Sequence, residues 1–145
     1  MKRELEFRVW DEVENKYFEP IYEAYKGNLL DLSISLSGQP IRRTIEFPAE
    51  HESLFPDRYI IEQYIGLTDK NGVKIFEGDA VEKNGKPYII KWNFLHASWG
   101  LFTNSGQSAY EIVCDITDAL GNSPKEWKDS TLLVVGNIHD NNLTQ

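Results

Sequence analysis

The stretch GLTDKNGVKIFEGDAV, residues 66–81, contains two turn signals around one apolar strand. The first turn is Asp69-Lys70-Asn71-Gly72, in which Gly72 supplies the positive φ that closes the chain. The second is at Gly78-Asp79, where the Asp79 carboxylate can bond nearby backbone and fix the entry of the next strand. Asp69, Asn71, Gly72, Gly78 and Asp79 are therefore assigned to structural turns, and the stretch predicts consecutive hairpins.

The same pattern of strand and turn continues on both sides of this stretch. Alternating or β-branched runs predict the strands, and Asn84-Gly85 is a strong signal for a two-residue hairpin. Pro87 cannot donate a ladder hydrogen bond, so its end of the strand is expected at a sheet edge. The predicted strands cover residues 4–10, 28–36, 41–47, 59–67, 73–76, 80–83, 87–92, 98–106 with its turn, and 131–138.

Helical signals are few. Residues 110–120, YEIVCDITDAL, have apolar residues at helical spacing and also suit a strand, and we assign them to helix. Ser123-Pro124-Lys125-Glu126 is a capping box with Pro at the first helical position, so a short helical turn is expected there. The predicted fold class is mainly β, a β-rich α+β fold of antiparallel strands and hairpins with one or two short helices.

The length of 145 residues suits a single domain over residues 1–145. The polar segment 48–57, bracketed by prolines, is the best candidate for an internal boundary. It would separate an N-terminal β lobe, 1–57, from a C-terminal lobe, 58–145. The strand pair around IFEGDAV and PYIIKW resembles an SH3-like small barrel, which is an analogy of fold only.

Charge and cysteine content limit the classes of function. The formal net charge of −8 has the wrong sign for general nucleic-acid binding, and Arg42-Arg43 is the compact basic pair within the predicted strands. Cys114 is the single cysteine, so no disulfide can form within the chain, as expected for a reducing cytoplasm. The first residues lack the apolar core of a signal peptide, and a soluble cytoplasmic protein without membrane contact is expected.

Motifs for metal, nucleotide or nucleophilic chemistry are missing from the sequence. His51, His96 and His139 are scattered, and the Asp69 turn lacks the later acids of a calcium loop. Glycine-rich phosphate loops and serine-nucleophile elbows do not occur, and Cys114 lies in an apolar run where a buried hydrophobe is the simpler interpretation. No cofactor, metal or catalytic residue is predicted, and the protein is expected not to be an enzyme.

Tryptophans are the candidate interaction residues. Trp10, Trp92 and Trp99 lie on or beside predicted strands, and the alternation of residues 4–10 leaves Trp10 on the polar face. Exposed tryptophan on a sheet often marks an interface or a ligand platform. The structural alternative is that a second sheet or subunit covers these side chains.

Three sequence blocks resemble the YopX-like family of small proteins encoded by bacteriophages and prophages. They are FRVWD at 7–11, QYIGLTDKNGVKIFEGDAV at 63–81 and VVGNIHDN at 134–141. The second block is long and specific, and it departs from the family pattern mildly, with Ile65 for Thr, Phe76 for Tyr and Ala80 for Ile, while the third block has His139 for Tyr. The resemblance implies a β-rich fold, a phage or prophage origin and expression in the cytoplasm of a bacterial host. It carries over no catalytic residue.

Together these observations favour a non-enzymatic protein–protein interaction module whose partner is a host or phage protein, with a homo-oligomer as a further option. One alternative is a small barrel that binds single-stranded nucleic acid by aromatic stacking, against which the net charge argues. A third class is an enzyme whose site assembles from acids such as Asp69, Asp79 and Asp140.

Overall fold

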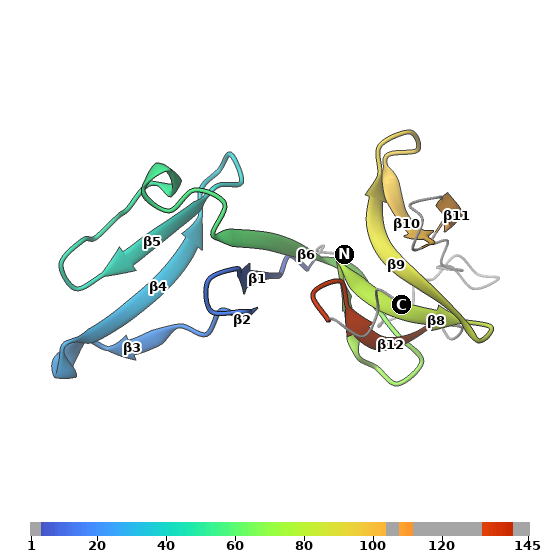
Figure 1. Ribbon diagram of the computed structural model, residues 1–145, viewed down its shortest axis with the longest axis horizontal. Helices are drawn as coiled ribbons and strands as arrows, with labels where there is room; N and C mark the ends of the chain where they lie inside the picture. Colours follow the sequence, from blue (N-terminus) through green and yellow to red (C-terminus); the bar gives the residue numbers. More distant parts are fainter. Residues whose placement is uncertain (1–3, 104–107, 112–131, 141–145) are drawn as a thin grey trace, which may run out of the picture. The chain divides into compact units, whose positions relative to one another are not determined.

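The structure, a computed structural model, describes residues 4–103 and 132–140 and the backbone of 108–111. Within these residues the chain forms antiparallel β-sheets and two short 3₁₀ helices, which confirms the predicted fold class (Figure 1). The chain divides into two compact units, one of residues 8–62 and one of residues 1–7 with 63–145, and each is described by itself. The single domain, its predicted lobes and the SH3-like portion stay predictions.

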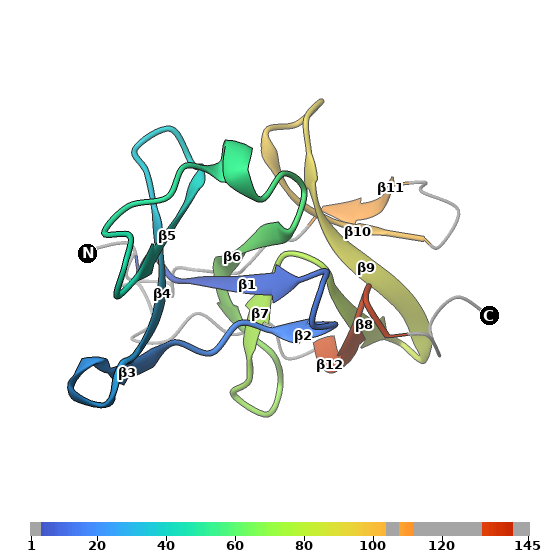
Figure 2. The ribbon, with the colours of Figure 1, turned by 60° about the vertical axis from the view of Figure 1, so that its left-hand side comes forward.

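The unit of residues 8–62 contains a three-stranded sheet of order β3-β4-β5 (Figure 2). Strands β4 and β5 pair from Leu30↔Thr44 to Ile34↔Pro40, so Leu30, Leu32 and Ile34 share one face. The elements of this unit are β1 (Phe7–Asp11), β2 (Lys16–Tyr17), β3 (Ile21–Glu23), η1 (Ala24–Lys26), β4 (Asn28–Ile34), β5 (Pro40–Thr44), η2 (Glu52–Leu54) and the start of β6 (Tyr59–Thr68).

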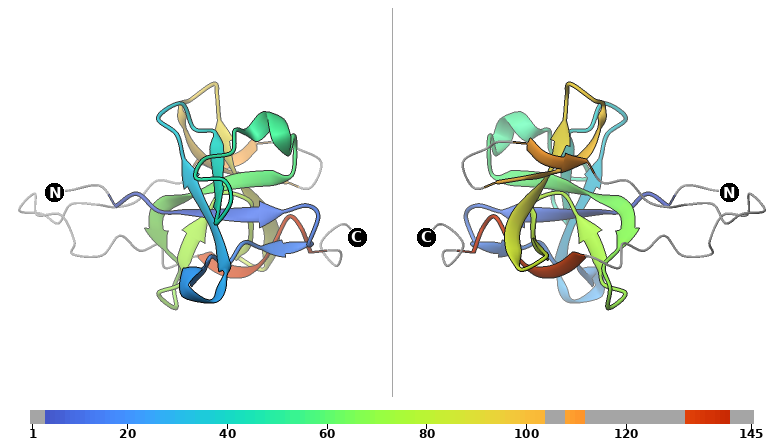
Figure 3. Two further views of the ribbon diagram at one scale, coloured as in Figure 1. Left: turned by 90° about the vertical axis from the view of Figure 1, so that its left-hand side faces the viewer. Right: turned by 90° about the vertical axis from the view of Figure 1, so that its right-hand side faces the viewer.

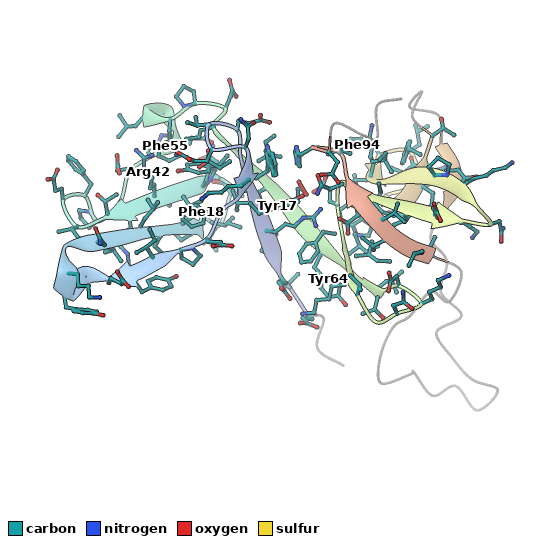
Figure 4. All side chains as sticks on the ribbon, turned by 60° about the horizontal axis from the view of Figure 1, so that its bottom comes forward. Tyr17, Phe18, Arg42, Phe55, Tyr64 and Phe94 are labelled. Carbon is teal, nitrogen blue, oxygen red and sulfur yellow. The ribbon has the colours of Figure 1, made fainter. Side chains whose placement is uncertain are left out.

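Aromatic rings form the buried part of this unit. Tyr59 packs edge-on against Phe55 at 5.3 Å and against Phe18 at 6.0 Å between ring centroids. The Arg42 guanidinium lies over the Phe55 ring at 4.7 Å, and Figure 4 labels both residues in this unit. The predicted strand 28–36 ends earlier than expected, at Ile34, because residues 35–38 form a turn that leaves Leu36 exposed.

A partly buried ion pair joins Asp11, the last residue of β1, to Arg58, which precedes β6. Arg58 donates from Nε and from an Nη to the two oxygens of Asp11, at 3.1 and 3.0 Å. The Asp11 Oδ1 also accepts from the backbone N–H groups of Val13 and Glu14. Because the carboxylate is nearly inaccessible, these bonds compensate the loss of its hydration.

The second unit is built on a five-stranded sheet of order β11-β10-β9-β8-β12. Both residues between β8 and β9, Asn84 and Gly85, have positive φ, as a type I′ hairpin requires. Strand β9 curves along its length (Figure 3). The strands are β7 (Lys74–Phe76), β8 (Asp79–Lys83), β9 (Lys86–Asn93), β10 (Ser98–Phe102), β11 (Ser108–Glu111) and β12 (Leu132–Asn137), with the remainder of β6.

The core of this unit lies between the end of β6, β7 and one face of the five-stranded sheet. Its buried members are aliphatic apart from one tyrosine, and Trp99 packs against them. They are Leu67, Ile75, Val81, Tyr88, Ile90, Leu101 and Leu132. Strand β9 lies between β8 and β10. Along β9, Pro87 pairs with Glu82 of β8, but β10 pairs only with residues 89–93 of β9, so Pro87 has no partner on the β10 side.

The predicted helix at 110–120 is wrong at its start, because Tyr110 and Glu111 belong to β11 and pair with β10. The rest of that segment, Cys114 and the helical turn at 123–126 lie outside the described residues. The one-turn 3₁₀ helix η2 occurs within the loop 48–57. Among the described residues, no helix has the length and apolar character needed to cross a membrane.

Asp11 contributes a part of the stability that depends on pH. Burial acts to raise its pKa, but the Arg58 guanidinium and the N–H groups of Glu14 and Val13 hold the pKa below its ordinary value. The folded state therefore binds this proton less tightly than the unfolded chain. The stabilisation is present above about pH 4 and is lost as the pH falls through the lowered folded pKa.

We expect the urea midpoint of the wild type to fall more steeply than that of Asp11→Asn between about pH 5 and pH 2.5. Tryptophan fluorescence measures the transition. Glu12→Gln, at the exposed neighbour, serves as the control and should follow the wild type. The same pH dependence in Asp11→Asn and in the control would show that the ion pair has no such role.

Candidate functional site

The turn within the stretch 66–81 is held by the Asp69 carboxylate, which is completely buried. Its Oδ1 accepts from the backbone N–H groups of Asn71 and Val73, at 2.8 and 2.9 Å. Its Oδ2 accepts from the N–H of Val134 on β12 at 2.9 Å. Asp69 therefore braces its own turn, which Gly72 closes at φ 81°, and also anchors the last described strand.

The other acids considered for catalysis also bind backbone groups. Asp79 Oδ2 accepts from the N–H of Phe76 at 2.8 Å, across the corner that Gly78 makes with φ 85°. Asp140 Oδ2 accepts from the N–H of Asn137 at 3.1 Å. In residues 4–103 and 132–140, no group of three His, Cys, Asp or Glu side chains is placed to hold a metal ion.

The histidines occupy separate turns. The Nδ1 of His51 accepts from the N–H of Ser53 and so caps η2. His96 lies in the loop between β9 and β10, and His139 follows β12, where its N–H donates to Asn137 Oδ1. Each histidine therefore belongs to a different local structure.

Trp10 is half-buried in the unit of residues 8–62. It is the cross-strand partner of Tyr17, and the two rings meet edge-on at 5.1 Å. The Arg8 guanidinium lies over the Tyr17 ring, 4.6 Å from its centroid, and the Tyr17 hydroxyl donates a hydrogen bond to the Glu62 carboxylate. Trp10 is thus partly covered by its neighbouring strand.

Trp92 and Trp99 come together in the other unit. They are cross-strand partners on β9 and β10, with ring centroids 5.0 Å apart in an edge-on arrangement. On these strands Ile90 and Leu101 point to the same face and belong to the core, since residues two apart share a face. Trp99 packs against the core, and Trp92 is 36% exposed. The pair therefore lies at the edge of the core, with Trp99 packed against it and Trp92 partly exposed to solvent.

Beyond this pair, the hairpin ends in two solvent-exposed apolar residues. Phe94 and Leu95 are 89% and 92% exposed. Asn93 is buried, its side-chain oxygen accepts from the N–H of Leu95 at 3.0 Å, and Ala97 adopts a positive φ of 49°. Residues 94–97, which we name the Phe94 tip, form the turn between β9 and β10 at the end of the hairpin (Figures 1 and 4). The Asn93 side chain holds this turn by its hydrogen bond to Leu95.

The charge around the Phe94 tip differs from that of the whole chain. No Asp or Glu occurs between Glu82 and Glu111, whereas Lys83, Lys86 and Lys91 lie in that interval. Only Lys91 of these three is near the Phe94 tip, because Lys83 and Lys86 flank the Asn84-Gly85 turn at the opposite end of β9. Lys91 is exposed and neighbours Trp92 along β9, so the two point to opposite faces of the hairpin.

Arginines offer no free basic patch in the part of the chain that the structure describes. Each of them pairs with a carboxylate at 2.9 to 3.2 Å, including both members of the basic pair noted in the sequence. The pairs are Arg8–Glu62, Arg42–Glu50, Arg43–Asp31 and Arg58–Asp11. These cations are therefore neutralised within the fold.

Sequence reasoning identified Trp92 and Trp99 but missed Phe94 and Leu95. Alternation marks apolar residues on strand faces, whereas these two lie in the turn between strands. The detectable signal was two bulky apolar residues in succession within a segment bounded by Asn93 and Ser98, where hairpin turns usually have small or polar residues.

A family model described as YopX protein matches residues 6–143 of this chain. Among solved structures, the crystal structure of protein EF1440 from Enterococcus faecalis is similar, with 22% sequence identity and a TM-score of 0.48. That comparison covers 99% of this chain and 100% of the other. No curated protein matches the chain.

Asp69→Ala is expected to lower the free energy of unfolding by about 3 kcal/mol or more, because three backbone N–H groups lose hydrogen bonds to a carboxylate, each worth about 1.5–3 kcal/mol. Asp69→Asn should lie between this variant and the wild type, since its amide keeps one acceptor. Urea unfolding followed by tryptophan fluorescence measures both. Lys70→Ala, an exposed change in the same turn, should stay within about 0.5 kcal/mol of the wild type; a matching value for Asp69→Ala would refute the anchor.

The Phe94 tip should be dispensable for folding. We expect Phe94→Ser combined with Leu95→Ser to change the free energy of unfolding by less than about 0.5 kcal/mol, since both side chains are already in water. Trp99→Ala should cost about 2 kcal/mol or more, because its ring packs against the core. Thermal and urea unfolding decide between these values, and a large loss in the double serine variant would contradict the assignment.

Proposed function

The chain belongs to the YopX protein family, as the three sequence blocks predicted, and from this premise we propose that it is a non-enzymatic protein–protein interaction module. The observation that carries the proposal is the Phe94 tip, where two apolar side chains stand in solvent on a braced hairpin. Exposed apolar residues that do not serve the fold are typical of interfaces, and rigid presentation lowers the entropy lost on binding.

The neighbouring Trp92 gives the tip the composition of a binding hot spot. Binding energy in interfaces concentrates in a few large side chains, among which tryptophan is enriched, surrounded by contacts that exclude water. Here the Trp92–Trp99 pair connects the tip to the core at its base. A partner that contacts the tip therefore meets a hairpin supported by a packed sheet.

The acids support a non-enzymatic role. Asp69, Asp79 and Asp140 each accept hydrogen bonds from backbone N–H groups in turns. A carboxylate used in this way holds structure, whereas a general base needs access to the proton that it removes. The proposal therefore assigns these three acids to the fold.

Single-stranded nucleic acid suits the tip less well than a protein does. A nucleic-acid groove needs cations alongside its stacking rings, to track the phosphates. The described arginines are held by carboxylates, and Lys91 points away from the face that carries Trp92. The proposed partner is accordingly a host or phage protein, or a second copy, in the cytoplasm of a bacterium that carries the phage or prophage.

Affinity capture from such cells tests the proposal. Full-length tagged wild type, Phe94→Ser with Leu95→Ser, and the control Val73→Ser are compared by quantitative mass spectrometry; Val73 is an exposed apolar residue on another turn of the same unit. We expect a protein retained by the wild type and the control to fall at least about tenfold with the double variant, as loss of a hot spot implies.

Two outcomes would overturn the proposal. One is an identical set of captured proteins, including this chain itself, for the wild type and the double serine variant. The other is binding of single-stranded DNA at low salt, in a filter assay, that the same substitutions abolish. The second outcome would assign the tip to the nucleic-acid alternative.

A further inference from the structure

A second interval of the sequence has the opposite charge pattern to the interval that contains the Phe94 tip. No Lys or Arg occurs between Arg43 and Arg58, and this interval contains Glu46, Glu50, Glu52 and Asp57. It mirrors the interval between Glu82 and Glu111, which has lysines and no acid. One chain thus carries an acidic stretch in one compact unit and a basic stretch in the other.

The acidic stretch also presents apolar side chains to solvent. Ile45 and Phe47 are 49% and 55% exposed, on either side of the exposed Glu46. The turn is held by backbone bonds: Thr44 N–H donates to the Phe47 carbonyl at 2.8 Å, and Phe47 N–H donates to the Thr44 hydroxyl at 3.2 Å. We name residues 44–47 the Glu46 turn.

The base of the Glu46 turn is fixed to the sheet. Arg42 and Glu50 exchange both backbone hydrogen bonds, at 3.1 and 2.7 Å, and their side chains form an ion pair. Glu50 is therefore neutralised within its own unit, whereas Glu46 lies at the exposed end of the turn. The turn, like the Phe94 tip, is a short apolar projection on a well-bonded support.

From these two surfaces we propose that the Phe94 tip of one copy binds the Glu46 turn of a second copy, in a head-to-tail contact. This inference rests on the proposed function, and it names the partner of the same hairpin. Phe94 and Leu95 would pack against Ile45 and Phe47, and Lys91 would approach Glu46. Opposite charges at the rim steer such a contact and set its orientation, while apolar burial supplies the affinity.

A head-to-tail contact leaves one unused tip and one unused turn on every dimer. It is a heterologous interface, which produces closed rings or open chains of copies according to the rotation between them. The wild type should therefore have a mass above that of a monomer, rising with concentration, in sedimentation velocity at low salt. Added salt should weaken the association, since the rim charges are exposed.

Complementation between two variants tests the head-to-tail geometry. The tip variant is Phe94→Asp with Leu95→Asp, and the turn variant is Ile45→Asp with Phe47→Asp. Each alone should associate at least about 30-fold more weakly than the wild type. Mixed together, they should form a one-to-one dimer, because the first retains an intact turn and the second an intact tip.

Charge reversal provides a second test, which does not depend on the aspartate variants folding. Glu46→Lys alone should weaken self-association, and Lys91→Glu alone should do the same, because each places like charges on the two sides of the contact. The double variant, Glu46→Lys with Lys91→Glu, has opposite charges facing each other again and should recover most of the wild-type association. Glu12→Lys, an exposed change outside both surfaces, is the control and should leave the association unchanged.

Three results would overturn the inference. They are a wild type that remains monomeric at every concentration, a turn variant that associates as well as the wild type, and a mixture of tip and turn variants that gives no dimer. A monomeric wild type that still captures another protein through the Phe94 tip would refute the second copy as partner and leave the proposed function standing. A monomeric wild type whose tip captures nothing would refute both.

Discussion

The buried carboxylate of Asp69 is the contact on which the rest of the second unit depends. One oxygen closes the turn between β6 and β7, and the other holds β12, which lies far along the chain. A single buried carboxylate here accepts hydrogen bonds from three backbone N–H groups, two in its own turn and one on β12. The stretch at 66–81 therefore has a structural role in this unit. Through Asp69 it connects β6 and β7 to β12, and these three strands contribute residues to the core against which the β9–β10 hairpin packs.

Along the β9–β10 hairpin, the residues that pack in the core and the residues that are exposed to solvent lie at different positions. Near β8 its residues belong to the core, at Trp99 they lie against it, and at Phe94 they are in solvent. Such a gradient allows the free end to bind without disturbing the fold, because the side chains that hold the hairpin differ from those that are exposed. The Asn93 bond keeps the end ordered, and an ordered projection loses less entropy on binding than a flexible loop.

Charge is distributed unevenly in this acidic protein. Several carboxylates are used internally, on arginines or on backbone N–H groups, and these are no longer available to a ligand. Along the sequence, the remaining charge leaves an acid-free interval that contains the Phe94 tip and a base-free interval that contains the Glu46 turn. Segregation of this kind contributes to recognition and orientation more than to raw affinity.

The sequence by itself determined most of the strands, though not β3 or β11, together with the hairpin at Asn84-Gly85 and the Gly72 turn, because alternation and turn chemistry act between residues close in the chain. It also indicated the tryptophans and the family. Only the tertiary structure decided that Asp69 reaches Val134, that Trp92 meets Trp99, and that Tyr17 covers part of Trp10. The exposure of Phe94 and Leu95 was likewise invisible, since a sequence records that a residue is apolar but not whether anything packs on it. Those outcomes depend on contacts between distant segments, which local pattern does not encode.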